Sequence, residues 1–446
     1  MASAVEQLAR NANWGAFSRA KELKSRLLFV MGALLVYRLG TYIPVPGIDP
    51  IIWKEIYSQK GGGILDMFNM FAGGALQRMT IFALGIMPYI SASIIMQLGT
   101  SMSKKLEALK KEGEMGRMKI NQYTRFLTVL LSTVQAYGLA IGLESMQSST
   151  GSAVIDPGLF FRMSTVITIV GGTVFLMWLG EQITQRGVGN GISLIIFAGI
   201  VAQLPMATAS VLELGRQGQF NLLGLLAIFA LVIGVIAFIV FMERAQRRIV
   251  VQYPKRQVGN RMSMGEQNHI PLKLNTAGVI PPIFASSLLL LPVTIVGFSG
   301  ADGGDFTAML ARLLQNGQPT YMMLYGALIM FFAFFYTAVV FNPEENSEML
   351  RRYGGFIPGI RPGKPTADYF DFVLTRITTV GGLYLVAICL LPEFLIARAG
   401  LPFYFGGTSL LIVVSVTMDT VAQIHSHLIA HQYEGLIKKS KLKGRK

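Results

Sequence analysis

Charge and cysteine are both scarce in this sequence. Only 14% of its 446 residues are charged, and Cys389 is its one cysteine. A soluble domain usually carries about 25% charged residues, and one thiol supports neither a disulfide framework nor a cysteine-based metal site. Hydrophobic residues make up 52% of the chain, which is more than one soluble core can bury. The composition therefore predicts an integral membrane protein.

Apolar stretches close to the ~20 residues that cross a bilayer recur along the chain. Ten of them predict an all-α polytopic membrane protein with ten transmembrane helices. The first follows a basic segment without a small-residue cleavage site, so we expect it to be retained. The stretches lie near residues 27–42, 79–99, 126–142, 159–179, 189–207, 221–242, 276–296, 320–341, 374–392 and 403–424.

Basic residues indicate the orientation of these spans. With the N-terminus inside, 31 of the 39 Lys and Arg fall in cytoplasmic segments and 6 in outer segments. This asymmetry satisfies the positive-inside rule, and an even number of spans then places both termini in the cytoplasm. Topology and attraction to anionic lipid would by themselves explain the basic charge.

Glycine and proline interrupt two of the apolar stretches at comparable places. Gly85–Ser93 and Gly278–Ser286 match at five of nine positions, although a window found by searching can match by chance. Proline removes a backbone hydrogen bond there and creates a hinge, and a five-span unit repeated once would lie inverted in the membrane. We therefore predict a cytoplasmic segment 1–26, five-span halves at 27–207 and 221–424, and a basic tail 431–446.

Three segments depart from simple spans and connectors. Segment 61–75 holds an apolar stretch of about ten residues, which fits either a re-entrant helix or a short amphipathic surface helix. The loops 243–274 and 341–370 are longer and more basic than a connection requires. Within the first loop, RRIVVQYPKRQ alternates with the period of a strand, which predicts a protruding hairpin.

The middle of the spans lacks the ionisable groups expected of a coupled solute carrier. Asp419, the deepest carboxylate, falls close to the inner boundary. His427 and His431 have the i,i+4 spacing of a two-histidine metal site, but no third ligand motif accompanies them. We expect no catalytic, metal or cofactor site, and a solute carrier and an intramembrane enzyme remain the rival classes.

Several long stretches carry a pattern that is specific to one family. They are MFNMFAGGALQRMTIFALGIMPYISASIIMQL, KKEGEMGR, FLMWLGEQITQRGVGNGIS, ERAQRRIVVQYPKRQ, PLKLNTAGVIPPIFASS, FNPEENSEML, PGIRPG and PFYFGGTSLLIVV. On these stretches, and along nearly its whole length, the chain resembles the SecY family, the pore-forming subunits of the bacterial protein-conducting channel.

The resemblance implies a plug and a constriction ring. The plug, a half-inserted segment at 63–74, would block the outer funnel at rest through Gly63, Ile64, Leu65, Met67, Phe68, Met70, Phe71 and Gly74. An apolar ring would exclude ions by dewetting, and i,i+4 pairs on one helix face suit a pore lining. Without the resemblance, its members would be ordinary core or lipid-facing isoleucines. They are Ile86, Ile90, Ile192, Ile196, Ile283 and Ile412.

A lateral gate and a docking surface also follow from the resemblance. The gate would open between the second and seventh spans, where Ser91, Gln135 and Asn275 match a polar cluster. Ordinary interhelical hydrogen bonds would explain these three residues as well. The two basic loops would dock the ribosome and the SecA motor, because clustered arginine suits anionic RNA and the PGIRPG turn is rigid. The implied docking residues are Arg247, Arg248, Arg256 and Arg361.

The function implied is a passive channel in the bacterial inner membrane, driven by the SecA ATPase or by chain synthesis at the ribosome. It would pass unfolded presecretory chains across the membrane and release hydrophobic segments of nascent membrane proteins sideways into lipid. The small subunits SecE and SecG are further partners that the resemblance implies.

Overall fold

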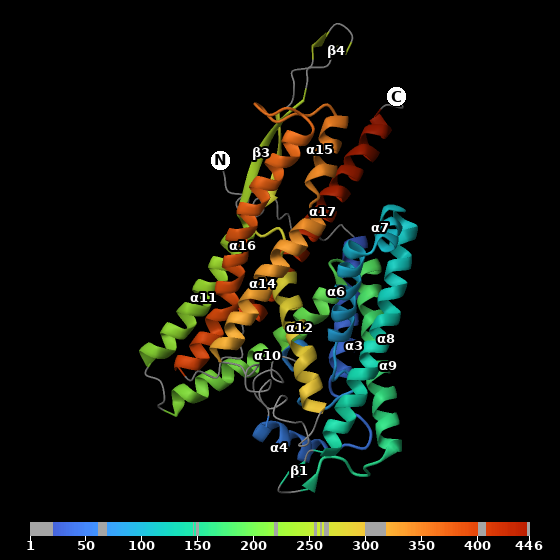
Figure 1. Cartoon of the computed structure of the whole chain (residues 1–446), viewed down its shortest axis with the longest axis vertical. Helices are drawn as coiled ribbons and strands as arrows, with labels where there is room; N and C mark the ends of the chain where they lie inside the picture. The colour runs from blue at the N-terminus through green and yellow to red at the C-terminus, as the bar shows by residue number, and fades with distance from the viewer. Residues whose placement is uncertain are drawn as a thin grey trace. The chain divides into compact units, whose positions relative to one another are not determined.

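The chain folds into two compact units of helices, each built from more than one stretch of sequence. Unit 1 comprises Met1–Tyr89, Phe126–Gln203 and Val416–Lys446, and unit 2 comprises Ile90–Arg125 and Leu204–Ser415. The structure, a computed structural model (Figure 1), describes residues 21–60, 69–145, 147–148, 151–217, 222–253, 257–258, 261–262, 267–298, 318–399 and 407–443.

Unit 1 contains the first helices of the chain and the C-terminal part of the last one. It includes a row of aromatic rings in which Tyr37, Phe82, Phe175 and Trp178 follow one another with centroids 5.8–6.1 Å apart. Offset aromatic pairs at this separation add to the free energy gained by burial. The row joins α3 to α9. Its whole elements are α3 (Lys21–Gly40), α4 (Pro50–Lys60), β1 (Gln147–Ser148), β2 (Gly151–Ser152) and α9 (Leu159–Arg186), and it shares α8 (Glu114–Ser145), α10 (Gly191–Arg216) and α17 (Gly407–Lys443) with unit 2.

Unit 2 packs its helices around α14 and carries the long hairpin. Phe284 on α12 lies edge-on to Phe332 and Tyr336 of α14, with ring centroids 5.7 and 6.4 Å away. The elements are α6 (Met87–Met102), α7 (Lys104–Lys111), α11 (Leu222–Arg244), β3 (Gln246–Gln252), β4 (Gln257–Val258), β5 (Arg261–Met262), β6 (Gln267–Lys273), α12 (Ile280–Phe298), α14 (Pro319–Val340), α15 (Pro343–Arg352) and α16 (Lys364–Ala399).

A helix lies at each of the ten places where the sequence predicts a span. Seven helical stretches among the described residues are long and apolar enough to cross a membrane. The remaining three places are occupied by α3, by the 16-residue α6 and by α12. The all-α polytopic membrane fold is therefore confirmed. The seven are Glu114–Glu144, Leu159–Arg186, Gly191–Glu213, Leu226–Arg244, Pro319–Arg352, Lys364–Pro392 and Gly407–Ile429.

The prolines of the two interrupted stretches begin helices, which corrects the prediction that they hinge helices in mid-span. Helix α6 begins at Met87 and α12 at Ile280, so Pro88 and Pro281 lie in the first turn, where no intrahelical N–H bond is lost. In both stretches a glycine with positive φ stands two residues before the helix: φ is 55° at Gly85 and 64° at Gly278. The matching sequence windows thus share one local conformation.

The predicted hairpin is present and longer than the motif that suggested it. Strands β3 and β6 pair antiparallel over seven residues, from Gln246 opposite Lys273 to Gln252 opposite Gln267. Along β3, Ile249 and Val251 are buried while Arg248 and Val250 are exposed. This alternation is the one expected when successive side chains point to opposite faces of a strand.

Candidate functional site

The predicted ring isoleucines are mostly buried, but Ile86 and Ile90 do not lie on one helix as predicted. Five of the six are buried, and Ile192 is half-buried. Ile86 precedes the first residue of α6, so it does not share a helix face with Ile90 by i,i+4 spacing. Ile192 and Ile196 both lie on α10 and keep that relation. Three of the six belong to each unit, and the ring itself stays a prediction.

Only the end of the predicted plug lies within the described residues. Its members Met70, Phe71 and Gly74 are buried, while Gly63, Ile64, Leu65, Met67 and Phe68 fall outside the described residues. Residues 72–86 form turns and an isolated bridge from Thr80 to Pro44, instead of the helical start of the second span. We name residues 69–86, which include the last six residues of the predicted plug, the post-plug segment.

Side chains from two helices hold the backbone of the post-plug segment. Arg38 Nη1 of α3 donates a hydrogen bond to the Gly73 carbonyl oxygen over 2.9 Å, and Gln203 Nε2 of α10 donates to the Asn69 carbonyl oxygen over 3.0 Å. The side chain of Asn69 accepts from the Gln77 amide at 2.9 Å. Each bond satisfies a backbone or side-chain group that would otherwise favour solvent. The segment is therefore tethered on both sides.

A close approach of two backbones accompanies these tethers. A Cβ placed on Gly73, whose φ is 69°, would lie 2.9 Å from the Cα atom of Gly199 on α10. A Cβ on Gly199 would in turn lie 3.2 Å from the backbone of Gly73 and 3.0 Å from the Tyr37 hydroxyl. Only glycine fits both positions without a shift of the backbone. Sequence inspection did not single out Arg38, Gln203 or Gly199 for this role, because the contacts join positions 35 to 134 residues apart.

The predicted gate residues are all buried, and one of them has a strong hydrogen bond. Asn275 Nδ2 donates to Glu243 Oε1 over 2.6 Å and to the Gly278 carbonyl oxygen over 3.0 Å. Gln135 on α8 is 7% exposed, and its Oε1 atom is buried without a partner among the described residues. Ser91 is 6% exposed on α6. The sequence did not single out Glu243, which lies at the start of the predicted loop 243–274.

The basic loops stand on a hydrophobic platform of unit 2, made by β3, β6, α15, α16 and the turn between the two helices. Its buried core is continuous across these elements. The backbones of Gln252 and Phe356 exchange two hydrogen bonds of 2.9 Å, which attach the hairpin to the turn. The core residues are Ile249, Val251, Leu272, Leu350, Ile357, Phe370, Val373, Leu374 and Ile377.

Arg361 occupies the turn of this platform with its backbone fixed. Its carbonyl oxygen accepts from Thr366 Oγ1 over 2.9 Å, and Ser347 Oγ donates to the Gly363 carbonyl oxygen over 2.6 Å. The side chains of Arg247, Arg248 and Arg361 are exposed, while the predicted docking residue Arg256 falls outside the described residues. The platform thus presents three solvated guanidinium groups on one packed body. Within the described part of the chain, no three His, Cys, Asp or Glu side chains group as a metal site would require.

Comparison with known proteins gives a consistent assignment. The SecY family model matches residues 80–421. The protein translocase subunit SecY of Rickettsia conorii is 56% identical over 422 residues, which cover 95% of this chain and 97% of that protein. A solved SecY, described with a plug domain that stabilises the closed translocation channel and maintains a membrane seal, superposes with TM-score 0.65 at 18% identity, covering 91% of this chain and 92% of its own.

A second solved structure, Sec61 in the canine ribosome-channel complex of the endoplasmic reticulum, gives TM-score 0.63 at 17% identity, with 91% and 92% of the two chains covered. At these identities the two structures establish the shared fold. The family model and the relative at 56% identity also establish the family. The chain belongs to the SecY family of protein translocase subunits.

Proposed function

We propose that this chain is a gated channel, which passes unfolded presecretory polypeptides across the bacterial inner membrane and lets hydrophobic segments leave sideways into lipid. Family membership makes it a multi-pass, protein-conducting channel subunit and no enzyme. The observation that carries the finer proposal is the tethered post-plug segment, because it links the predicted plug directly to Ile86 of the predicted ring. A plug that is held in this way can return to one place after each translocation.

The seal is assigned to the isoleucine ring together with the plug. Apolar side chains around a constriction exclude ions by dewetting, and branched aliphatic groups adapt to a passing polypeptide of varied sequence. The burial of five ring isoleucines supports this assignment. So does the solved SecY relative whose plug domain is described as maintaining a membrane seal.

The lateral gate is assigned to α6 and α12. Asn275 precedes α12 and donates to Glu243 at the end of α11, so this bond holds the start of α12 in place. An apolar nascent segment gains free energy on entering lipid, since Leu, Ile and Phe are each favourable by about 0.3–0.6 kcal/mol at a helix centre. That gain has to exceed what holds the gate shut. A hydrogen bond to a charged group contributes about 1.5–3 kcal/mol, so the 2.6 Å bond between Asn275 and Glu243 opposes displacement of the start of α12 by a comparable free energy.

Docking of the driving partners is assigned to the platform of unit 2. Its exposed arginines lie on loops that the positive-inside rule places in the cytoplasm, together with both termini. The canine relative was solved in a complex with the ribosome, and we extend that partner to this chain. The SecA motor, the SecE and SecG subunits and membrane lipid complete the proposed assembly.

Reconstitution tests the proposed function directly. The chain is placed in proteoliposomes with SecE and SecG, and SecA, ATP and a presecretory protein are added. We expect part of the presecretory protein to become resistant to added protease until detergent opens the vesicles. Omission of ATP and a mature-domain substrate without a signal sequence serve as controls. Protease sensitivity equal to that of the controls would contradict the proposal.

A further inference from the structure

Residues 43–49 of unit 1 form an extended segment whose first half pairs with the post-plug segment. The Val45 amide donates a hydrogen bond to the Met79 carbonyl oxygen over 2.9 Å, and the Ile81 amide donates to the Ile43 carbonyl oxygen over 3.0 Å. The two bonds flank an antiparallel bridge. Each satisfies backbone groups that would otherwise need water. The post-plug segment is thus held by a third part of the chain, in addition to the tethers from α3 and α10.

The second half of the extended segment pairs with the loop between β2 and α9. The Asp49 amide donates to the Ala153 carbonyl oxygen over 2.9 Å, and the Ile155 amide donates to the Gly47 carbonyl oxygen over 3.1 Å. Helix α4 follows at once and lies beside β1 (Figure 1). By the proposed orientation these connections are on the outer side of the membrane. The extended segment therefore attaches the post-plug segment to a packed outer loop.

Helix α4 adds a side-chain bond to the same region. Its N-cap is Asp49, whose Oδ1 atom accepts from the Ile51 amide over 2.8 Å. One turn later Trp53 is 5% exposed, and its Nε1 atom donates to the Leu76 carbonyl oxygen over 3.0 Å. A buried indole N–H requires such a partner, and this partner belongs to the post-plug segment. We name residues 43–57 the outer clamp.

The outer clamp holds a strained turn. Among the residues that the structure describes, Met79 is the one non-glycine residue with a positive φ, 46°. The Met79 amide donates to the Leu76 carbonyl oxygen and the Thr80 amide to the Ala75 carbonyl oxygen, both over 3.0 Å. This is the pattern of a Schellman motif with Met79 at the C′ position. Glycine is usual there, because a Cβ atom is unfavourable at a positive φ.

The conformation of Met79 depends on its surroundings. A residue other than glycine keeps such a backbone conformation only where the rest of the structure fixes it. Met79 is 0% exposed, and both carbonyl oxygens of the turn accept a bond from the outer clamp: that of Leu76 from Trp53, and that of Met79 from Val45. Without these donors we expect the turn to relax and to redirect the chain that follows it.

The chain that follows leads directly to the predicted ring. Two further turns, each closed by a backbone hydrogen bond of 2.8–2.9 Å, lie between Met79 and Ile86. Closed turns fix the backbone dihedral angles of their central residues. Ile86 comes next and is 2% exposed. A change of backbone conformation at Met79 therefore reaches Ile86.

We propose that the outer clamp positions the seal of the channel: Trp53 and Val45 hold the strained turn at Met79, and the turn holds Ile86 at the constriction. Trp53 is thus a positioning residue, which acts on the ring through the backbone and needs no contact with a translocating chain. The inference rests on the ring in the proposed function. It adds a part outside the ring whose loss opens the resting channel.

Trp53→Phe tests the positioning role, because phenylalanine retains a buried ring and lacks the N–H donor. In hydrogen exchange followed by mass spectrometry, the amides of residues 79–81 should exchange about fivefold faster, the factor that one hydrogen bond of ordinary net strength gives. The resting ion conductance of the full chain with SecE and SecG in planar bilayers should rise several-fold. Unchanged exchange or unchanged conductance would overturn the proposal.

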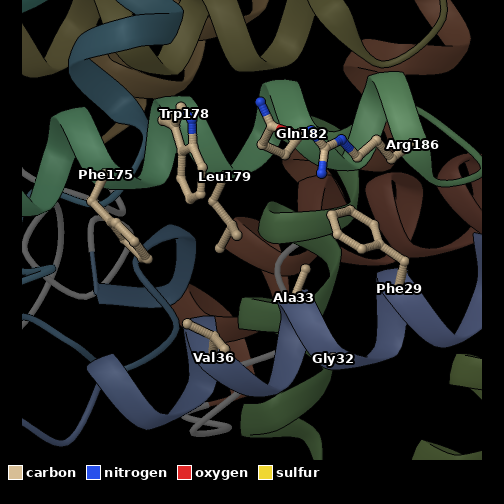
Figure 2. Close-up of a pocket in the computed structure, with 9 residues that line it drawn as sticks. All are labelled: Phe29, Gly32, Ala33, Val36, Phe175, Trp178, Leu179, Gln182 and Arg186. Carbon is tan, nitrogen blue, oxygen red and sulfur yellow. The ribbon is translucent and has the colours of Figure 1, made fainter.

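Two controls separate the hydrogen bond from packing. Ile56→Ala removes a side chain of α4 that is 2% exposed and leaves the indole bond in place. It should lower the melting temperature more than Trp53→Phe and raise the conductance less. Trp178→Phe makes the same exchange of rings on α9, where Trp178 is 52% exposed and lines a groove towards α3 (Figure 2). It should conduct like the parent chain. Conductance that simply follows the fall in melting temperature across the variants would mean a structural role only, against the proposal.

The strain at Met79 is tested by two variants that both remove its side chain. At an ordinary position glycine is less favourable than alanine, whereas at a positive φ this order reverses. Met79→Gly should therefore melt at a higher temperature than Met79→Ala and show a lower resting conductance. The ordinary order would contradict the strained turn.

Ile86→Gly calibrates the same recordings, so that failure of the outer clamp and failure of the ring are told apart. A raised conductance of Ile86→Gly beside a parent-like Trp53→Phe would overturn the positioning role and leave the ring standing. Parent-like conductance of both variants would overturn the ring assignment, and the positioning role with it.

Discussion

Ile195 and Ile196 are neighbours on α10 with nearly equal burial, 2% and 3% exposed. A helix turns by 100° at each residue, so the two side chains face different directions. Ile195 lies 3.5 Å from where a Cβ on Gly180 of α9 would be, and Ile192 of the assigned ring lies 3.2 Å from the same point, so both side chains reach α9 inside unit 1. Ile196 belongs to the face assigned to the ring. Substitutions at Ile195 and Ile196 can therefore distinguish a residue that packs against α9 from one assigned to the seal.

The ring assignment predicts a leak from Ile196→Gly and none from Ile195→Gly. Both changes remove a buried side chain and introduce the same helix penalty of about 1 kcal/mol, so their effects on stability should be similar. Only the loss of Ile196 should open a wetted path and raise the resting ion conductance several-fold in planar bilayers. Equal conductance of the two variants would remove Ile196 from the seal.

The bond between Asn275 and Glu243 predicts a change in the gating threshold, because it fixes where the gate helix α12 begins. Glu243→Ala removes the acceptor of the 2.6 Å bond and should favour displacement of α12 from its resting position by about 1.5–3 kcal/mol. A preprotein with a shortened apolar signal should then be exported more efficiently than by the parent chain. Glu243→Gln retains an acceptor oxygen without the charge, and its export efficiency should lie between those of the parent chain and Glu243→Ala. A Glu243→Ala chain that rejects the shortened signal as strictly as the parent would contradict the role.

At the scale of elements, the post-plug segment shows where sequence reasoning stops. Apolar stretches of about the length of a span located a helix at all ten expected places, and strand alternation located the hairpin of β3 and β6. It placed the second span from residue 79, whereas α6 begins at Met87. Hydropathy cannot distinguish apolar turns from apolar helix. The turns are fixed by glycines with positive φ and by tethers from Arg38 and Gln203, which lie far away in the sequence.

The close approach of the post-plug segment to α10 predicts a strong effect of Gly199→Ala. The added methyl group would meet the backbone of Gly73 at 3.2 Å, and overpacking of this kind costs about 1–3 kcal/mol. The melting temperature in detergent should fall, and the resting conductance should rise as the segment shifts. Gly234→Ala on α11 is the matched control, because nothing lies within 4 Å of its added Cβ. A fall in melting temperature as large for Gly234→Ala would refute the packing argument.

The docking platform predicts a position-specific effect of charge reversal. Arg361→Glu reverses a guanidinium whose backbone is held by Thr366, whereas Lys364→Glu makes the same change in charge three residues later, at the start of α16. We expect Arg361→Glu to reduce SecA-driven export several-fold more than Lys364→Glu, with equal amounts of both chains in the membrane. Equal losses would indicate a general charge effect without a docking site.

At the scale of the whole molecule, the class of protein, the family and the basic cytoplasmic face could be predicted from the sequence. The groove between α3 and α9 could not be predicted, because Gly32 and Trp178 come together only when the two helices pack. Nor could Glu243 be predicted as the partner of Asn275, since a carboxylate at the end of a span resembles an ordinary charge at the membrane boundary. Both features depend on pairing between distant residues.

The central claim is that a polypeptide passes through the constriction lined by the ring isoleucines. Disulfide crosslinking to a stalled presecretory chain with one cysteine tests it, in a Cys389→Ser background that removes the chain's own thiol. The account predicts crosslinks to Ile196→Cys of unit 1 and to Ile412→Cys of unit 2, and none to Ile233→Cys, which is 66% exposed on α11. Crosslinks to Ile233→Cys without crosslinks to the two ring positions would contradict it.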